Sequence, residues 1–373
     1  MQRKFIRIYE NFIVSMRELE EIKVLIDNGL YEDAFEKLHE LEDPFDKVQA
    51  LTAIALALYH ENGDIHWIET LLEDAMYLAD KIKKPQFKVS AYGLIASTYS
   101  SIGDKEAALM LFEDSIDIAS RIKNPIWRSM ALAYLGYYMA ISGFTNHALD
   151  IFEVAFDDII RAEVGYNLKV DHLIETAELL EKAGDQLHSR EALPFYKRAY
   201  DIFDKLHLSQ KAALLEKKSK LASTVMHAGM PEVREALHDE DVDTAISILS
   251  TAYSGAQRFV GLLEIALWFK KIKNPQYSEI METALRGNIE EGISEDNMQY
   301  TVRLLTELGN LDRAIAFANK IIDIKKKSEA LSMVAVELAK QGKFEKAYLL
   351  AREIPEDYIR RDTIEEIAAI EGT

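Results

Sequence analysis

Residues 92–115 read YGLIASTYSSIGDKEAALMLFEDS. Apolar or small residues recur at helical spacing on both sides of Gly103. They are Tyr92, Ile95, Ala96 and Tyr99 before it and Ala108, Phe112 and Ser115 after it. Because glycine readily adopts the left-handed conformation that ends a helix, the segment predicts two antiparallel helices joined at Gly103.

The same pattern recurs along the chain. Gly63, Gly103 and Gly143 are forty residues apart, and Gly184 follows one residue late. The residues around Gly143 repeat the offsets, with Leu132, Leu135, Gly136 and Met139 before it and Ala148, Phe152 and Ala155 after it. The aspartates that follow three of these glycines are predicted to cap the second helix of each pair; they are Asp64, Asp104 and Asp185. A fixed period of this length indicates a solenoid of stacked helix pairs.

The organisation changes along the chain. Similar phrases ending at Pro85, Pro125 and Pro275 mark ends of helices, since a helix stops before a proline. Near the C-terminus, Gly309 and Gly342 are 33 residues apart and indicate a shorter version of the unit. We therefore predict an N-terminal capping helix over 1–20, repeats over 21–226 with units of about forty residues in the centre, and further helical repeats over 227–373. The register is hard to follow in 227–298, which is predicted to be irregular, and regular again in 299–373.

Composition narrows the class of protein. The 373 residues are 49% hydrophobic and contain no cysteine, which excludes disulfides, cysteine zinc sites and thiol nucleophiles. The formal net charge of −19 disfavours binding to nucleic acid or anionic membranes and favours a basic partner. No apolar run has the length of a signal peptide core or a membrane span, so we expect a cytoplasmic protein. The charge-rich composition also suggests a thermophilic source.

The sequence offers little catalytic chemistry. It contains no phosphate-binding glycine loop, no dinucleotide fingerprint, no nucleophile elbow and no His-Glu-x-x-His motif. His60 and His66 flank one turn, and acidic residues cluster in 238–243, but polar turns and acidic helix starts explain both. We therefore predict no catalytic residues, no metal and no cofactor, and a protein that is not an enzyme.

The repeats resemble the tetratricopeptide repeat. The resemblance is strongest in the pair Leu135–Gly136 and in the series Gly143, Ala148, Phe152 and Ala155. That family has a unit of about 34 residues, so the forty-residue units here are expected to have a longer second helix. The resemblance implies an all-α fold, a right-handed superhelix of antiparallel helix pairs, with a concave groove that binds a protein or peptide.

The resemblance also implies which residues line that groove, namely outward positions of the first helix of each pair. Carried onto three units, these positions are Ala50, Ala53, Ala57, His60, Ser90, Gly93, Ser97, Met130, Ala133, Tyr137 and Ile141. The set is small and apolar, and Met130, Tyr137 and Ile141 would form an adaptable wall for a helix or peptide. The alternative is that these residues simply pack against neighbouring helices.

The N-terminal segment complicates the use of this groove. Apolar residues recur there at helical spacing, at Phe5, Ile6, Tyr9, Phe12, Ile13, Met16 and Leu19. Such a stripe suits a helix that caps the solenoid. The same stripe would suit a segment that fills the groove of its own chain or of a second copy. A homodimer is therefore an alternative.

Three functions follow from these observations. The leading prediction is a non-catalytic scaffold or adaptor that binds a protein or peptide segment in the groove. The alternative is a regulatory protein that senses a ligand or peptide there. The third is an enzyme built on a helical solenoid, which lacks any motif in its favour.

Overall fold

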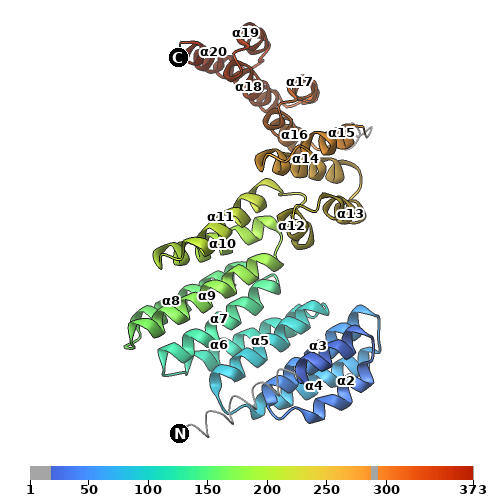
Figure 1. Cartoon of the computed structure of the whole chain (residues 1–373), viewed down its shortest axis with the longest axis vertical. Coiled ribbons are helices and arrows are strands. Elements are labelled where there is room, and N and C mark those ends of the chain that lie inside the picture. The colour runs from blue at the N-terminus through green and yellow to red at the C-terminus, as the bar shows by residue number, and fades with distance from the viewer. Residues whose placement is uncertain (1–17, 287–292, 373) are drawn as a thin grey trace. The chain divides into compact units, whose positions relative to one another are not determined.

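The computed structural model describes residues 18–286 and 293–372, and these residues form helices and turns without strands. Successive helices pair into hairpins, as Figure 1 shows, which confirms the all-α solenoid of helix pairs. The chain divides into two compact units. Unit 1 comprises residues up to Leu187 together with Pro194–Leu215, and unit 2 comprises His188–Leu193 and the residues from Glu216 onward.

Unit 1 is built from long helices in antiparallel pairs. Residues 18–27 are helical, and the named elements are α2 (Tyr31–Lys37), a 3-10 turn (Leu38–Glu40), α3 (Pro44–His60), α4 (Ile65–Lys81), α5 (Pro85–Ser101), α6 (Lys105–Ser120), α7 (Pro125–Ile141), α8 (Thr145–Arg161), α9 (Tyr166–Gln186), α10 (Ser189–Lys205) and α11 (Ser209–Thr224), the last two shared with unit 2. The first helices α3, α5, α7 and α9 contact one another in sequence. The second helices α4, α6 and α8 contact the first helices on either side of them. The first helices therefore form the inner layer of unit 1.

The turns that join the paired helices α3–α4, α5–α6 and α7–α8 are as predicted, except that asparagine replaces glycine at the left-handed position in one of them. Gly103 and Gly143 adopt the left-handed conformation, with φ of +97° and +85°. Gly63 does not; the preceding Asn62 has φ of 56° and ends α3 instead. Asparagine tolerates this conformation because its short polar side chain bonds locally, so the two residue types exchange roles in one repeat.

Caps and prolines set the helix boundaries. Asp64 and Asp104 cap α4 and α6 as predicted, accepting hydrogen bonds from the backbone N–H of His66 and Ala107 at 3.0 Å each. Pro85 and Pro125 are the first residues of α5 and α7. A proline at this position lacks only an N–H that has no helical partner, so each proline both follows one helix and starts the next.

The core of unit 1 lies between the helices of each pair. Ala108, Phe112, Ala148 and Phe152 are fully buried, as the repeat pattern predicts. Gly136 lies so close to this core that a Cβ atom there would stand 3.0 Å from the ring of Phe152. Small residues at these positions therefore let the paired helices approach until the phenylalanine rings fill the space between them.

The prediction for the fourth unit is wrong in detail. Gly184 lies inside α9 and is buried, rather than at a turn, because α9 continues to Gln186. A Cβ atom at this position would stand 2.6 Å from the ring of Tyr196, so close packing explains the glycine. Asp185 lies within α9 rather than before a helix, and it accepts a hydrogen bond from the Tyr196 hydroxyl at 2.8 Å.

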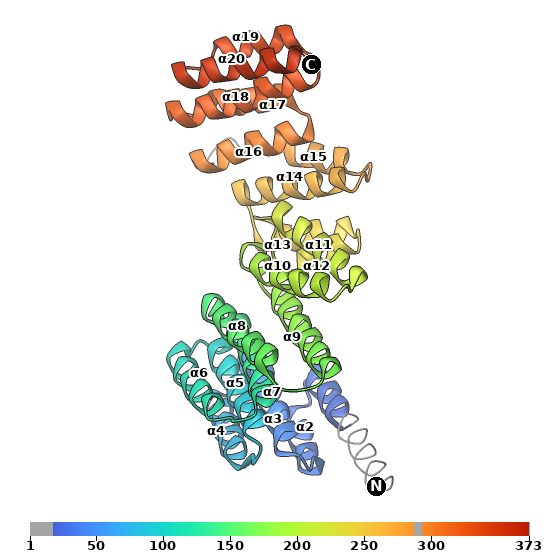
Figure 2. The same ribbon diagram turned by 90° about the vertical axis from the view of Figure 1, so that its left-hand side faces the viewer.

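Unit 2 repeats the arrangement with shorter second helices. Its elements are α12 (Pro231–His238), α13 (Val242–Ala252), α14 (Gly255–Lys271), α15 (Tyr277–Leu285), α16 (Glu295–Leu308), α17 (Leu311–Lys320), α18 (Ile324–Lys340), α19 (Phe344–Arg352) and α20 (Asp357–Glu371). Figure 2 shows α14, α16, α18 and α20 following one another, and each contacts the next. These four helices form the inner layer of unit 2.

The region 227–298, predicted to be irregular, contains the pairs α12–α13 and α14–α15 in its described part. Their turns place Glu240 and Lys273 in the left-handed conformation, with φ of 61° and 62°. His207 does the same between α10 and α11. Because residues other than glycine occupy the left-handed position of these turns, the spacing of glycines cannot be followed here, although the helix pairs continue.

Two further points concern the ends and the surface of the chain. Of the capping helix predicted over 1–20, residues 1–17, with all of its apolar stripe except Leu19, lie outside the described residues, and residues 18–20 are helical. In the part that is described, none of the helices combines the length and apolar character needed to cross a bilayer.

Candidate binding surface

A cavity of about 200 Å³ lies between the N-terminal parts of the inner helices α3 and α5 and the middle and later part of the inner helix α7. We call it the α3–α5–α7 slot, and it is lined by Phe45, Gln49, Gln86, Phe87, Ser90, Met130, Ala131, Tyr134 and Tyr138. The lining includes four aromatic rings and no ionisable acid or base other than the tyrosine hydroxyls. An apolar concavity with a few polar groups is the usual form of a binding site.

Caps and a ring contact hold the starts of the three helices that line the slot. Asp43 caps α3 by accepting from the N–H of Phe45 at 2.7 Å. Asn124 caps α7 by accepting from the N–H of Ile126 and Trp127 at 3.0 and 3.1 Å. The rings of Phe45 and Phe87 lie 6.2 Å apart between centroids, which joins the starts of α3 and α5.

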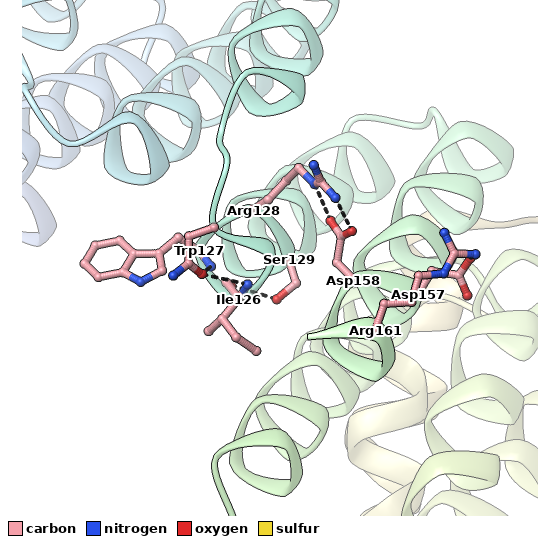
Figure 3. A network of polar contacts seen from close by, with 8 residues as sticks. Ile126, Trp127, Arg128, Ser129, Asp157, Asp158 and Arg161 are labelled. Carbon is pink, nitrogen blue, oxygen red and sulfur yellow. Dashed lines mark hydrogen bonds and ion pairs between the residues drawn. The ribbon is translucent and has the colours of Figure 1, made fainter. Parts of the chain in front are cut away.

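A partly buried ion pair holds the start of α7 against α8. Figure 3 shows Arg128 pointing at Asp158, whose carboxylate accepts from Nε of Arg128 at 2.5 Å and from a second guanidinium nitrogen. Asp158 is only 5% exposed. Its hydrogen bond raises the pKa of Arg128, so the guanidinium stays charged and the pair fixes the helix turn that carries Met130. The neighbouring pair of Arg161 and Asp157, 2.9 Å apart, is exposed.

The structure distributes the predicted groove residues between the interior and the surface. Met130 and Ser90 line the slot. Of the full set, Ala50, Ser90, Gly93, Ser97 and Ala133 are buried, Ala53, Ala57, Met130, Tyr137 and Ile141 are half-buried, and His60 is exposed. Gly93 shows why burial is common, since a Cβ there would stand 2.9 Å from the ring of Tyr138 on α7. The groove built from these positions stays a prediction.

Most slot residues were not anticipated from the repeat pattern. Phe45, Gln49, Gln86, Phe87, Tyr134 and Tyr138 lie on the same inner helices but outside the predicted set. The available signal was an aromatic residue one or two positions after each helix-starting proline. It appears in Pro44-Phe45, in Pro85-Gln86-Phe87 and in Pro125-Ile126-Trp127.

Unit 2 has a larger and charged cavity on its inner layer. It measures about 750 Å³ between α14, α16, α18 and α20. Four basic and four acidic residues line it, namely Lys270, Lys271, Arg303 and Lys340 with Glu307, Glu329, Glu337 and Glu366. Two of the basic residues pair with the same acid, since Lys271 and Arg303 each lie 3.7 Å from the carboxylate of Glu307. The cavity therefore offers balanced charge to a ligand.

A buried carboxylate organises the start of unit 2. Glu264 on α14 is fully buried and accepts from the backbone N–H of His227 and Ala228 at 2.7 and 2.8 Å. Its other oxygen lies 3.0 Å from Nδ1 of His227 and accepts from the Tyr300 hydroxyl at 2.5 Å. The His227 ring stacks on Tyr300, with centroids 5.1 Å apart, and its Nε2 lies 3.3 Å from Oδ1 of Asn297.

The titration behaviour of this network indicates a structural role. The hydrogen bond to Glu264 raises the pKa of His227 despite its partial burial, and burial with the same carboxylate raises the pKa of Tyr300. The carboxylate of Glu264 thus stabilises the charged form of the His227 ring and the neutral form of the Tyr300 phenol. All four contacts of Glu264 join the 227–228 segment and α16 to α14, so the network fastens three segments together.

Comparisons with known proteins agree with this architecture. The tetratricopeptide repeat model matches residues 89–121, which span α5, α6 and the turn at Gly103. Ton1535 from Thermococcus onnurineus NA1, known from a crystal structure, is 44% identical over 95% of this chain and 99% of its own, with a TM-score of 0.88. A circular tandem repeat protein with novel repeat topology and enhanced subunit contact surfaces is 12% identical over 96% of this chain and 88% of its own. Its TM-score of 0.20 supports no argument about the fold. No curated protein matches the sequence.

The helix pairs, their turn chemistry and the repeat match define a tetratricopeptide-like helical repeat protein. The identity and coverage shared with Ton1535 are more specific than the fold alone. The chain belongs to the same family as Ton1535.

Proposed function

We propose that this chain is a non-catalytic scaffold whose inner layer in unit 1 binds a segment of a partner protein. Tetratricopeptide repeats generally mediate protein–protein interaction, and the surface of unit 1 carries features that suit it. The observation that best supports this proposal is an aromatic residue within the first three positions of each of the inner helices α3, α5, α7 and α9. These residues are Phe45 on α3, Phe87 on α5, Trp127 on α7 and Tyr166 on α9.

Three of these rings are accessible. Phe87, Trp127 and Tyr166 are 40%, 44% and 76% exposed, and Phe87 forms part of the slot wall. Large aromatic side chains dominate the energetics of protein interfaces, because they bury much area at little entropic cost. A row of them at the starts of successive helices supports binding of an extended or helical segment.

The charge of the chain supports a basic partner. The formal net charge is −19, whereas the slot lining carries no charged side chain. Such an arrangement attracts a basic segment over distance and leaves the contact itself to apolar groups. Association should therefore weaken as salt screens the long-range attraction.

The test is affinity capture from a native lysate with matched variants. The binding variant combines Phe87→Ala and Trp127→Ala, which remove exposed rings from the inner helices. The control combines Tyr77→Ala and Met110→Ala, which remove side chains that are 60% and 63% exposed on the second helices α4 and α6. The proposal expects a protein that the wild type and the control retain and the binding variant loses. Identical partner lists from all three forms would refute it.

A ligand-sensing role is a second candidate, favoured by the cavity of unit 2. Its volume of about 750 Å³ lies within the range of small-molecule sites, and its four basic and four acidic residues would suit a zwitterionic ligand. Thermal-shift screening with small zwitterions would reveal it, because a ligand of the folded state raises the melting temperature. An Arg303→Ala variant that still shows the full shift would argue against this cavity as the site.

A further inference from the structure

The α3–α5–α7 slot contains an unusual polar group. Gln86, on the first turn of α5, is only 5% exposed and lines the slot. Its backbone carbonyl accepts from the Ser90 hydroxyl at 3.2 Å, but within 18–286 and 293–372 its side-chain amide has no hydrogen-bond partner. The amide is not among the fully enclosed polar atoms that lack a partner, so it keeps contact with the open space of the slot and can hydrogen-bond a group that enters there.

The slot contains a second polar side chain that makes no side-chain hydrogen bond to the described residues. Tyr138 on α7 is 9% exposed, and its hydroxyl has no hydrogen-bond partner among the described residues. Two other buried tyrosines of unit 1 differ in this respect, since the hydroxyls of Tyr92 and Tyr196 donate to Asp80 and Asp185 at 2.8 Å each. Burial raises the pKa of Tyr138, so its hydroxyl stays protonated and both donates and accepts.

The volume of the slot and the absence of charge in its lining limit which side chains it can receive. A volume of about 200 Å³ is below the range of about 300–1,000 Å³ typical of sites for free small molecules, and it suits a single bulky side chain. The lining has no counter-charge, so a charged side chain would lose its hydration without compensation. The rings of Phe45, Phe87 and Tyr134 with Met130 favour an aromatic or large aliphatic group.

We propose that the slot receives one bulky uncharged side chain of the partner segment, and that Gln86 and Tyr138 hydrogen-bond the peptide unit that carries it. A glutamine amide offers a donor and an acceptor, which match the C=O and N–H of a peptide. The slot thus selects the anchor residue of the segment, an inference that rests on the proposed scaffold function. The exposed rings of Phe87 and Trp127 would contact the flanking residues of the same segment.

The test uses minimal peptide mimics and methyl NMR of the full chain labelled at the methionine methyl groups. N-acetyl-phenylalaninamide and N-acetyl-leucinamide each present one apolar side chain between two peptide units; N-acetyl-lysinamide and benzyl alcohol are the comparison probes. Met130 lines the slot and Met333 lines the cavity of unit 2, so the two methyl signals report the two places separately. Met→Leu variants assign each signal.

We expect the two apolar mimics to shift the Met130 signal saturably at millimolar concentrations, as is usual for fragments of this size, and to leave Met333 unchanged. Gln86→Leu and Tyr138→Phe keep the shape of the slot and remove one polar group each, and each should weaken binding about tenfold. Gln210→Leu, the matched change at an exposed position of α11, should leave binding unchanged.

Several results would contradict the proposed anchor site. The inference is wrong if Met130 does not respond, if both methyl signals move together, or if N-acetyl-lysinamide binds as well as the apolar mimics. It is also wrong if Gln86→Leu and Tyr138→Phe both bind like the wild type, or if benzyl alcohol binds as tightly as the mimics, since the peptide unit then contributes nothing. A partner captured through Phe87 and Trp127 while the mimics fail would leave the scaffold function standing and remove only this anchor site.

Discussion

Replacing Glu264 should destabilise unit 2 more than any exposed change of the same type. Glu264→Ala leaves two buried backbone N–H groups, those of His227 and Ala228, without an acceptor. At about 1–2 kcal/mol each, plus the lost contact to Tyr300 and the cavity left behind, we expect a loss of about 4 kcal/mol in the free energy of unfolding. Glu264→Gln retains one acceptor oxygen for the two N–H groups, so it should cost only about 1–2 kcal/mol.

The effect of Glu264 should also depend on pH. Glu264 raises the pKa of His227 in the folded state. A raised folded pKa contributes stability that is fully present below the unfolded pKa of about 6.5 and is lost as pH rises through the folded value. The difference in stability between the wild type and Glu264→Gln should therefore be larger at about pH 6 than at about pH 9.

Guanidinium unfolding followed by tryptophan fluorescence would measure both effects. Trp268 is buried in α14 beside Glu264, so a background with Trp67→Phe and Trp127→Phe makes it the sole reporter. Glu279→Ala, an exposed change on α15, serves as the control and should stay within about 0.5 kcal/mol of the wild type. The reasoning fails if Glu264→Ala costs no more than the control, or if the difference from Glu264→Gln grows as pH rises.

Three further substitutions test other parts of the packing. The buried Thr301 hydroxyl has no hydrogen-bond partner among the described residues, so Thr301→Val should stabilise the protein by about 1 kcal/mol, measured by the same unfolding experiment. Arg128→Ala leaves the carboxylate of Asp158 buried without its partner and should cost about 3–5 kcal/mol by chemical denaturation, whereas an unchanged midpoint would show that the pair is dispensable. Gly184→Ala should cost about 1–3 kcal/mol despite the helix propensity of alanine, because its Cβ would meet the ring of Tyr196 at 2.6 Å; a higher melting temperature would contradict this.

The helix pairs could be predicted from sequence because their chemistry is local. Gly143, Ala148 and Phe152 lie within ten residues, and each has a requirement that shows in the residue type: a left-handed φ, a close approach and a filled core. Where another residue meets the same requirement, the prediction shifts or fails. Asn62 replaces Gly63 at one turn, and Lys273 replaces glycine at another.

The slot was harder to predict because it depends on how neighbouring pairs pack. Offsets counted from the turn place Ser97 and Ala133 at the surface, yet both are buried because successive inner helices contact one another. The open space lies instead between the starts of α3 and α5 and the later part of α7, where Gln86 and Tyr138 line it from different repeats. The network around Glu264 joins residues 36 and 37 positions apart in the chain, without any periodic signal.

The slot draws its walls from three consecutive helix pairs, and this has a consequence for dynamics. In a solenoid each pair contacts mainly its neighbours, so pairs open individually and the end ones most easily. A segment seated against α3, α5 and α7 at once would make the opening of any one pair cost its binding energy as well. Occupancy would then convert three loosely coupled repeats into one cooperative block, visible as hydrogen-exchange protection that extends together across residues 44–141.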